Sequence, residues 1–180
     1  MKYLAMFILV GYCSVCTAQI GLTTSVNINI SLPNVALLDI EPNNSAITLA
    51  LQAPTHAGAS VTAPVNNTSK WLNFTSAITA GLTRKIMVQI TSGTVPGGLR
   101  LKLSLSNYSG GGSGTLGSSV TGLSLGNSAQ NIITGIGAAF TGNGMNNGYN
   151  LIYGLEISDY SQLRYGNSNA LIITYTLLDN

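Results

Sequence analysis

The sequence is poor in charged side chains. Only 7% of its 180 residues are charged, and seven Lys and Arg stand against five Asp and Glu. A nucleic-acid-binding surface needs clustered basic residues to contact phosphates, and an acidic partner needs a similar patch. So few and so nearly balanced charges exclude both partners. The surface is instead expected to be covered by Ser, Thr, Asn and Gly.

Groups for catalysis and metal binding are equally scarce. His56 is the only histidine, and no glycine-framed serine accompanies it, so a hydrolase triad has no support. The carboxylates that a glycosidase would need occur as two pairs near expected turns, Asp39 with Glu41 and Glu156 with Asp159. One histidine and five carboxylates are also too few for an evident zinc or calcium site. We therefore expect no enzyme, no metal and no cofactor, and we interpret His56 as a surface-loop residue.

Cysteine is confined to the amino terminus, as Cys13 and Cys16. Lys2 precedes an apolar run over residues 3–10, and small residues follow, ending at Ala18. This order is typical of a cleavable secretory signal peptide, and the apolar run is too short to span a bilayer. Cleavage is expected after Ala18, which removes both cysteines and leaves an exported chain without disulfides. A lipoprotein anchor is the alternative, although bulky residues precede both cysteines.

The remaining residues, 19–180, are enough for a single domain with its own hydrophobic core. They contain nine to eleven segments of strand-like pattern between turn signals and no amphipathic helix. This organisation predicts an all-β fold, an antiparallel two-sheet immunoglobulin-like sandwich with Greek-key links. The main strand candidates are residues 35–40, 47–51, 70–75, 85–90, 99–105, 129–136, 149–157 and 170–178.

The strongest local pattern predicts a hairpin between residues 85–90 and 99–105. Apolar and polar residues alternate in both segments, and a loop-forming stretch separates them. Pairing Ile90 with Leu99 places the apolar residues of both strands on one face. The last candidate strand, 170–178, is apolar on both faces, which favours a central position in the core.

Two glycine-rich segments, 106–117 and 141–148, are expected to be loops, the first of them mobile. Neither has the lysine or the strand-to-helix context of a phosphate-binding loop. Tyr108 and Tyr149 lie at their edges, where binding residues are often found. Because an aromatic face can stack on a sugar ring, these two tyrosines are the candidate ligand contacts, whereas Trp71 is expected in the core.

The longest alternating pattern lies in residues 19–32, at the start of the mature chain. One parity from Ile20 to Leu32 is mainly apolar, and the other is polar or glycine. At about 3.3 Å per residue, this row extends roughly 43 Å, about twice an ordinary strand. Such a strand either crosses more than one sheet region or reaches outside its own domain.

Several of these features together resemble bacterial fimbrial subunits of the pilin and spore-coat-U kind. They are the signal peptide, the alternating strand over residues 22–32, the glycine-rich connections and a carboxy-terminal strand with Tyr175. Residues 71–75, 95–99 and 130–136 also resemble segments of uncharacterised secreted proteins from the Bacteroidota.

In such fimbriae, the amino-terminal strand of one subunit completes the incomplete sandwich of its neighbour. The resemblance implies a cell-surface homopolymer, assembled by strand exchange and contributing to adhesion. It also implies a donor row of Leu22, Val26, Ile28, Ile30 and Leu32. The same row can instead be the domain's own first strand, which leaves a monomeric secreted carbohydrate- or matrix-binding module as the alternative.

Overall fold

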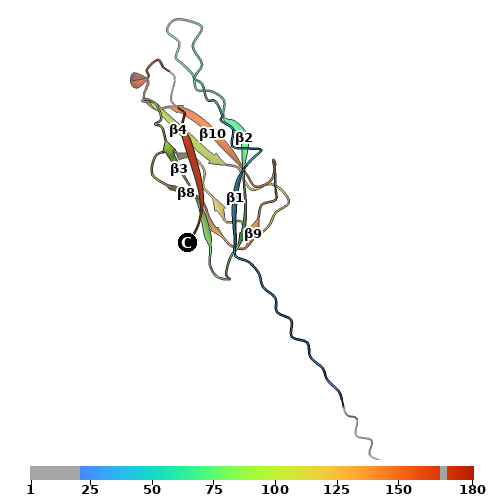
Figure 1. The fold of residues 1–180 in the computed structure, drawn as a ribbon. Helices are drawn as coiled ribbons and strands as arrows, with labels where there is room; N and C mark the ends of the chain where they lie inside the picture. Colours follow the sequence, from blue (N-terminus) through green and yellow to red (C-terminus); the bar gives the residue numbers. More distant parts are fainter. Residues whose placement is uncertain (1–20, 167–169) are drawn as a thin grey trace, which may run out of the picture. The chain divides into compact units, whose positions relative to one another are not determined.

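The computed structural model describes residues 21–166 and 170–180 (Figure 1). The predicted signal peptide, residues 1–18, lies outside the described residues. The chain divides into two parts, Met1–Leu32 and Pro33–Asn180, and the second contains every assigned strand. It is all-β, with two antiparallel sheets packed as a sandwich, so the predicted fold class is confirmed. The immunoglobulin-like and Greek-key details stay predictions.

The first sheet has seven strands in the order β5-β9-β2-β10-β4-β7, with β1 paired to the other side of β2. Its strands are β1 (Val35–Glu41), β2 (Asn67–Ala77), β4 (Leu99–Leu105), β5 (Ser113–Gly114), β7 (Leu123–Ser124), β9 (Ala139–Phe140) and β10 (Tyr149–Ile157). The central strand β2 pairs with β1 along one side and with β10 and then β9 along the other. This arrangement leaves β1 at an edge of the sheet.

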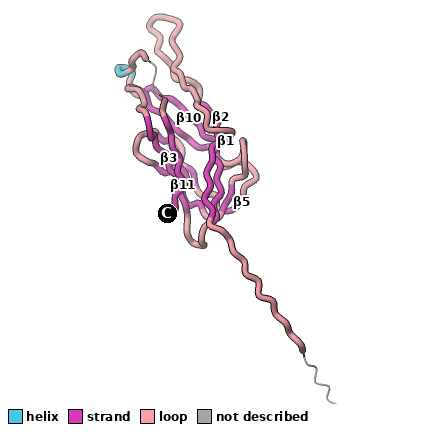
Figure 2. Tube along the Cα trace, in the orientation of Figure 1, coloured by secondary structure: helices cyan, strands magenta, loops and turns pink. Residues whose placement is uncertain are grey.

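The second sheet has four strands in the order β11-β3-β8-β6. They are β3 (Arg84–Ser92), β6 (Ser118–Ser119), β8 (Gln130–Ile136) and β11 (Ile172–Asp179). A three-residue 3₁₀ helix, η1 (Tyr160–Gln162), follows β10 (Figure 2). Within the ranges that the structure covers, no helix is long and apolar enough to cross a membrane.

Alternate side chains of the strands form the core between the two sheets. In β3, for example, Ile86, Val88 and Ile90 are buried and the residues between them are partly exposed. Burying such a side chain contributes about 1.5–3 kcal/mol. The buried apolar residues are Leu72, Phe74, Ile86, Val88, Ile90, Leu101, Leu103, Leu105, Leu125, Ile132, Ile133, Ile136, Ala139, Tyr149, Leu151 and Tyr153.

The predicted hairpin between residues 85–90 and 99–105 is wrong, because β3 and β4 belong to different sheets. β3 pairs with β11 and β8, whereas β4 pairs with β10 and β7. Ile90 therefore does not pair with Leu99. Alternation shows which face of a strand is buried, but two strands that face each other across the core have the same pattern as two neighbours.

The predicted central position of the last strand is also wrong, since β11 is an edge strand that pairs only with β3 in the described chain. Its odd-numbered residues, Ile173, Tyr175 and Leu177, pack against the core. The apolar residues of the opposite face, Ile172 and Leu178, are exposed. An apolar second face thus reflects an uncovered surface rather than burial on both sides.

The sequence predicts a strand over residues 47–51, but these residues have no ladder partner in the part of the chain that the structure describes. Ile47 and Leu49 are nevertheless partly buried against the core, and Thr48 between them is exposed. An isolated bridge joins Gln52 to Thr62 beyond this segment. The alternation of burial expected of a strand is therefore present without the hydrogen-bonded neighbour.

Candidate functional site

The alternating row in residues 21–32 is exposed. Its large side chains are Leu22 (94% exposed), Val26 (81%), Ile28 (77%), Ile30 (81%) and Leu32 (81%). Residues 21–32 contain no charged side chain, and no strand is assigned to them. Single exposed apolar residues are common on protein surfaces, but five on one parity of a short segment form an exposed apolar row of the kind found at interaction sites.

Tyr149 is buried, so the expectation of an exposed ring at the edge of a loop is wrong. It is 3% exposed, and its ring stacks on Phe74 with centroids 6.2 Å apart. Burial raises the pKa of Tyr149, and the nearby Tyr108 raises it further. The sequence does carry a signal for this position, because Tyr149 shares its parity with the buried Leu151 and Tyr153 of the same strand.

The ring of Tyr108 is also held by neighbours. It packs edge-on against Tyr149, with centroids 5.9 Å apart. Its hydroxyl donates to the carbonyl oxygen of Thr141 at 3.1 Å and accepts a hydrogen bond from the backbone N–H of Gly112. Both predicted ligand contacts therefore join the two glycine-rich segments to the core, Tyr149 as a buried residue and Tyr108 as a partly buried one.

The segment 106–117 contains regular structure where only a loop was expected. Within this segment, β5 forms a ladder with β9, and Gly112 and Gly114 let the two backbones approach each other closely. A Cβ on Gly112 would lie 2.1 Å from the carbonyl oxygen of Phe140, and a Cβ on Gly114 would lie 2.1 Å from that of Ala138. These glycines are thus packing positions, a role that a glycine-rich pattern does not distinguish from loop flexibility.

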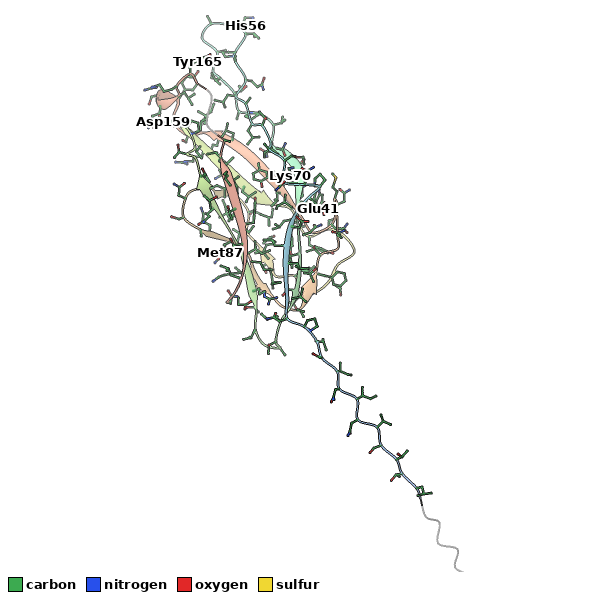
Figure 3. All side chains as sticks on the ribbon, in the orientation of Figure 1. Glu41, His56, Lys70, Met87, Asp159 and Tyr165 are labelled. Atoms are coloured by element: carbon green, nitrogen blue, oxygen red, sulfur yellow. The ribbon has the colours of Figure 1, made fainter. Side chains whose placement is uncertain are left out.

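The structure brings no catalytic set together around His56. This residue lies on the projecting loop between β1 and β2, at the end far from Lys70 (Figure 3). Its Nδ1 is 2.9 Å from the hydroxyl of the adjacent Thr55, and both side chains are exposed. Among the residues that the structure describes, no three His, Cys, Asp or Glu residues gather closely enough to hold a metal ion.

Glu156 and Asp159 each have a structural partner. Asp159 caps η1 by accepting from the backbone N–H and hydroxyl of Ser161 and from Nε2 of Gln162, and these bonds lower its pKa. A carboxylate oxygen of Glu156 lies 3.9 Å from Nζ of Lys102 on the neighbouring strand. The predicted pair of Glu156 and Asp159 is therefore divided between two different structural contacts.

Lys70 is a buried amine, and its contacts give it a structural role. It is 6% exposed, and Nζ donates to the carbonyl oxygen and Oδ1 of Asn43 and to Oγ of Ser45, at 2.8–3.0 Å. Three acceptors satisfy the three N–H groups of an ammonium ion. Lys70 thus ties the beginning of the β1–β2 connection to β2.

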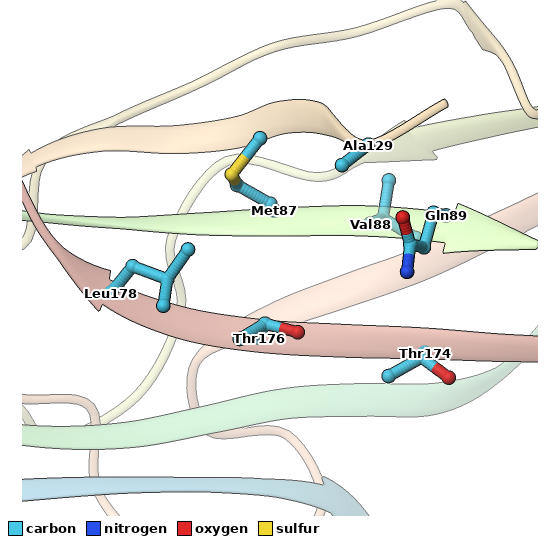
Figure 4. Close-up of a pocket in the computed structure, with 7 residues that line it drawn as sticks. All are labelled: Met87, Val88, Gln89, Ala129, Thr174, Thr176 and Leu178. Carbon is cyan, nitrogen blue, oxygen red and sulfur yellow. The ribbon is translucent and has the colours of Figure 1, made fainter. Parts of the chain in front are cut away.

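Two shallow hollows lie on the outer faces of the sheets. The hollow of about 180 Å³ on the second sheet lies over β3 and β11 and has no ionisable group (Figure 4). It is lined by Met87, Val88, Gln89, Ala129, Thr174, Thr176 and Leu178. The hollow of about 560 Å³ on the first sheet has Asp39 as its one ionisable side chain and is lined by Leu37, Leu38, Asp39, Asn73, Phe74, Thr75, Phe140, Gly142 and Asn143. Neither hollow holds the two ionisable groups that acid–base catalysis needs.

Two candidate features emerge. One is the exposed row of residues 22–32, and the other is the outer edges of β1 and β11, which have no ladder partner among the described residues. No protein-family model matches the chain, and neither a curated protein nor a solved structure matches it significantly.

Proposed function

We propose that the chain is a structural subunit of a bacterial surface filament of the fimbrial kind. It is exported through a cleaved signal peptide and contributes to adhesion. Its copies assemble when residues 22–32 of one subunit add to the sandwich of the next. The observation that carries this proposal is the exposed alternating row, because it has the pattern of a half-buried strand and lacks a buried face in the single chain.

The energetics favour association through this row. Burying its five large side chains would contribute on the order of 10 kcal/mol in total. Loss of translational freedom and ordering of the segment offset a large part of this gain. Backbone hydrogen bonds to a sheet edge add to the remainder and define the register, which is the usual basis of strand addition.

Mutation of the row tests the proposal without touching the core. The chain beginning at Gln19 is compared with a variant that carries Val26→Ser, Ile28→Ser and Ile30→Ser. A control with Asn27→Ser and Asn29→Ser changes only the polar parity. Light scattering after size-exclusion chromatography and negative-stain microscopy should show concentration-dependent oligomers or filaments for the parent and the control, and monomers for the triple variant.

A parent chain that stays monomeric at every concentration would contradict the proposal. Hydrogen exchange then gives the reason, since protected amides in residues 21–32 of that monomer would identify the row as the domain's own first strand.

The alternative function is a monomeric carbohydrate-binding module, and one observation favours it. Phe140 is 46% exposed in the hollow of about 560 Å³, beside Asp39 and Asn143. A ring with neighbouring amide and carboxylate groups matches the mixed apolar and hydroxyl surface of a sugar. Binding to a glycan array that disappears with Phe140→Ala would support this function, and a blank array for the parent chain would remove it.

A further inference from the structure

The dipeptide Asn-Gly occurs twice in the sequence, and both copies lie in the glycine-rich segment 141–148. They are Asn143-Gly144 and Asn147-Gly148. An asparagine before a glycine can lose its side-chain amide without an enzyme, because glycine has no Cβ to shield its backbone nitrogen from the neighbouring amide carbon. The two copies share this local chemistry, so a difference in their reactivity has to come from the fold.

The reaction sets two requirements. The backbone nitrogen of the glycine gives up its proton to hydroxide and bonds to Cγ of the asparagine; the Cγ–Nδ2 bond breaks, and Nδ2 takes up a proton from water and leaves as ammonia. Water then adds to one carbonyl of the resulting succinimide ring and opens it, which gives aspartate or isoaspartate. The asparagine side chain must therefore be able to turn toward the glycine nitrogen, and the glycine N–H must be accessible to base.

The fold occupies the backbone nitrogen of Gly148. Its N–H donates to the carbonyl oxygen of Ser109 at 2.7 Å, and the N–H of Ser109 donates back to the carbonyl oxygen of Gly148 at 2.9 Å. Gly148 is buried, and a Cβ there would lie 2.2 Å from the carbonyl oxygen of Leu72. This bridge must open locally before the nitrogen can react.

The side chain of Asn147 is held as well. Nδ2 donates to the carbonyl oxygens of Asn143 at 2.8 Å and of Met145 at 3.4 Å. Oδ1 accepts from the backbone N–H of Gly111 at 3.3 Å, and a Cβ on Gly110 would lie 2.4 Å from the same oxygen. Asn147 therefore cannot change its side-chain conformation without losing these contacts.

Asn143-Gly144 has neither restraint. Asn143 is exposed, and a Cβ on Gly144 would meet nothing within 4 Å. In the described part of the chain, the hydrogen bonds of this dipeptide are made by its two carbonyl oxygens, which accept from Asn147 and Asn73. These bonds leave the side-chain amide of Asn143 and the N–H of Gly144 without a partner there. The bond to the carbonyl oxygen of Asn143 also polarises the peptide group and makes the N–H of Gly144 more acidic.

We propose that Asn143 is a site of spontaneous deamidation in the folded protein and that the fold protects Asn147. The modified residue carries a carboxylate, so the hollow of about 560 Å³ that Asn143 lines gains a second negative charge in addition to that of Asp39. Two like charges in one hollow disfavour an anionic ligand. The inference goes beyond the proposed function and does not depend on it, because it needs only the fold of a single chain.

Mass spectrometry of the chain beginning at Gln19 tests the site. The folded chain is incubated at neutral and at mildly alkaline pH in water enriched in heavy oxygen, and it is then digested with pepsin in acid, which stops the reaction. Fragmentation of the peptides assigns the modification to Asn143 or Asn147. The heavy oxygen separates deamidation during the incubation from deamidation that came before it.

Asn143 should deamidate at least about tenfold faster than Asn147, because the second site reacts only after local opening. The rate at Asn143 should rise with pH, since the glycine nitrogen reacts in its deprotonated form. The matched control is the same chain unfolded in guanidinium chloride, in which the two Asn-Gly pairs should react at similar rates. Equal rates in the folded chain, a faster reaction at Asn147, or an Asn143 that folding slows as much as Asn147 would overturn the proposal.

Two variants check the contacts behind the difference. Asn143→Asp imitates one product and should keep the melting temperature of the parent, because the side chain is exposed. Asn147→Asp places a carboxylate against two carbonyl oxygens and should lower the melting temperature. An Asn147→Asp variant as stable as the parent would overturn the protection of Asn147, and a destabilised Asn143→Asp variant would overturn the unrestrained setting of Asn143.

Discussion

The hydroxyl of Tyr153 on β10 lies 2.6 Å from the hydroxyl of Tyr175 on β11, so a hydrogen bond joins the two sheets through the core. Burial raises the pKa of Tyr175, and the neighbouring Tyr153 raises it further. Burial also raises the pKa of Tyr153, although its hydrogen bond with Tyr175 opposes this effect. The pair thus connects β11, the edge strand of the second sheet, to β10 in the middle of the first sheet.

Removing one hydroxyl of this pair should be more harmful than removing both. Tyr175→Phe leaves the hydroxyl of Tyr153 buried without a partner and should cost about 1–3 kcal/mol, and Tyr153→Phe should act similarly. The double variant should be nearly as stable as the parent, because no buried polar group is left unpaired. Urea unfolding of the parent, the two single variants and the double variant gives the coupling free energy between the two hydroxyls. If the effects of the two single substitutions were strictly additive, the hydrogen bond would not exist.

The raised pKa values predict a loss of stability in alkali. The folded chain holds these two tyrosine protons more tightly than the unfolded chain, where the ordinary pKa is 10.0. The stabilisation is therefore fully present below about pH 10 and is lost as the pH rises toward the higher native pKa values, by up to about 1.4 kcal/mol per pH unit for each tyrosine.

Urea unfolding across the alkaline range checks this dependence. The Tyr153→Phe, Tyr175→Phe double variant should show a flatter decline above pH 10, whereas Tyr165→Phe, at a fully exposed position, should follow the parent. If the free energy of unfolding fell with pH at the same rate in all three proteins, the alkaline loss of stability would come from groups other than Tyr153 and Tyr175.

Two glycines in the same segment should respond in opposite ways to alanine. Gly112→Ala places a Cβ 2.1 Å from the carbonyl oxygen of Phe140, and backbone cannot move aside cheaply, so a cost of about 1–3 kcal/mol is expected. Gly111→Ala meets nothing within 4 Å and should be neutral or slightly stabilising. Equal midpoints of unfolding for the two variants would mean that β5 does not pack as described.

Cysteine pairs can test the assignment of β3 and β4 to different sheets. Gln89 and Thr174 are register partners on β3 and β11, so Gln89→Cys with Thr174→Cys should lose both free thiols on mild oxidation. Gln89→Cys with Arg100→Cys would react only if the two segments formed a hairpin with Ile90 opposite Leu99. Thiol titration before and after oxidation decides between the two topologies.

Side-chain pattern predicted the fold class but not the pairing of the strands. The apolar pattern in residues 149–157 gave the bounds of β10 correctly, and Tyr149, Leu151 and Tyr153 of that strand lie in the core. The same rule could not assign a partner to Ile90, since hydrogen bonds between strands involve backbone atoms that all residues share. Partners are decided by the connections and by packing across the core.

The candidate surface was only partly predictable for a similar reason. The row from Leu22 to Leu32 is a property of side-chain order, so the sequence showed it. β11 is an edge strand because no further strand lies beside it, and the side chains of residues 172–179 give no sign of that. The buried setting of Tyr149 had a signal in its parity, but its place beside a glycine-rich segment suggested exposure.

Each chain combines an exposed apolar row with unpaired strand edges, and in the proposed assembly this makes it a monomer with two different reactive ends. Head-to-tail contacts of this kind either close into a ring or grow without limit. The size of the product then depends on how many growing ends exist and on the concentration of free chains. In the proposed assembly, the supply of free chains therefore controls the length of the product, because each added chain presents a new free end.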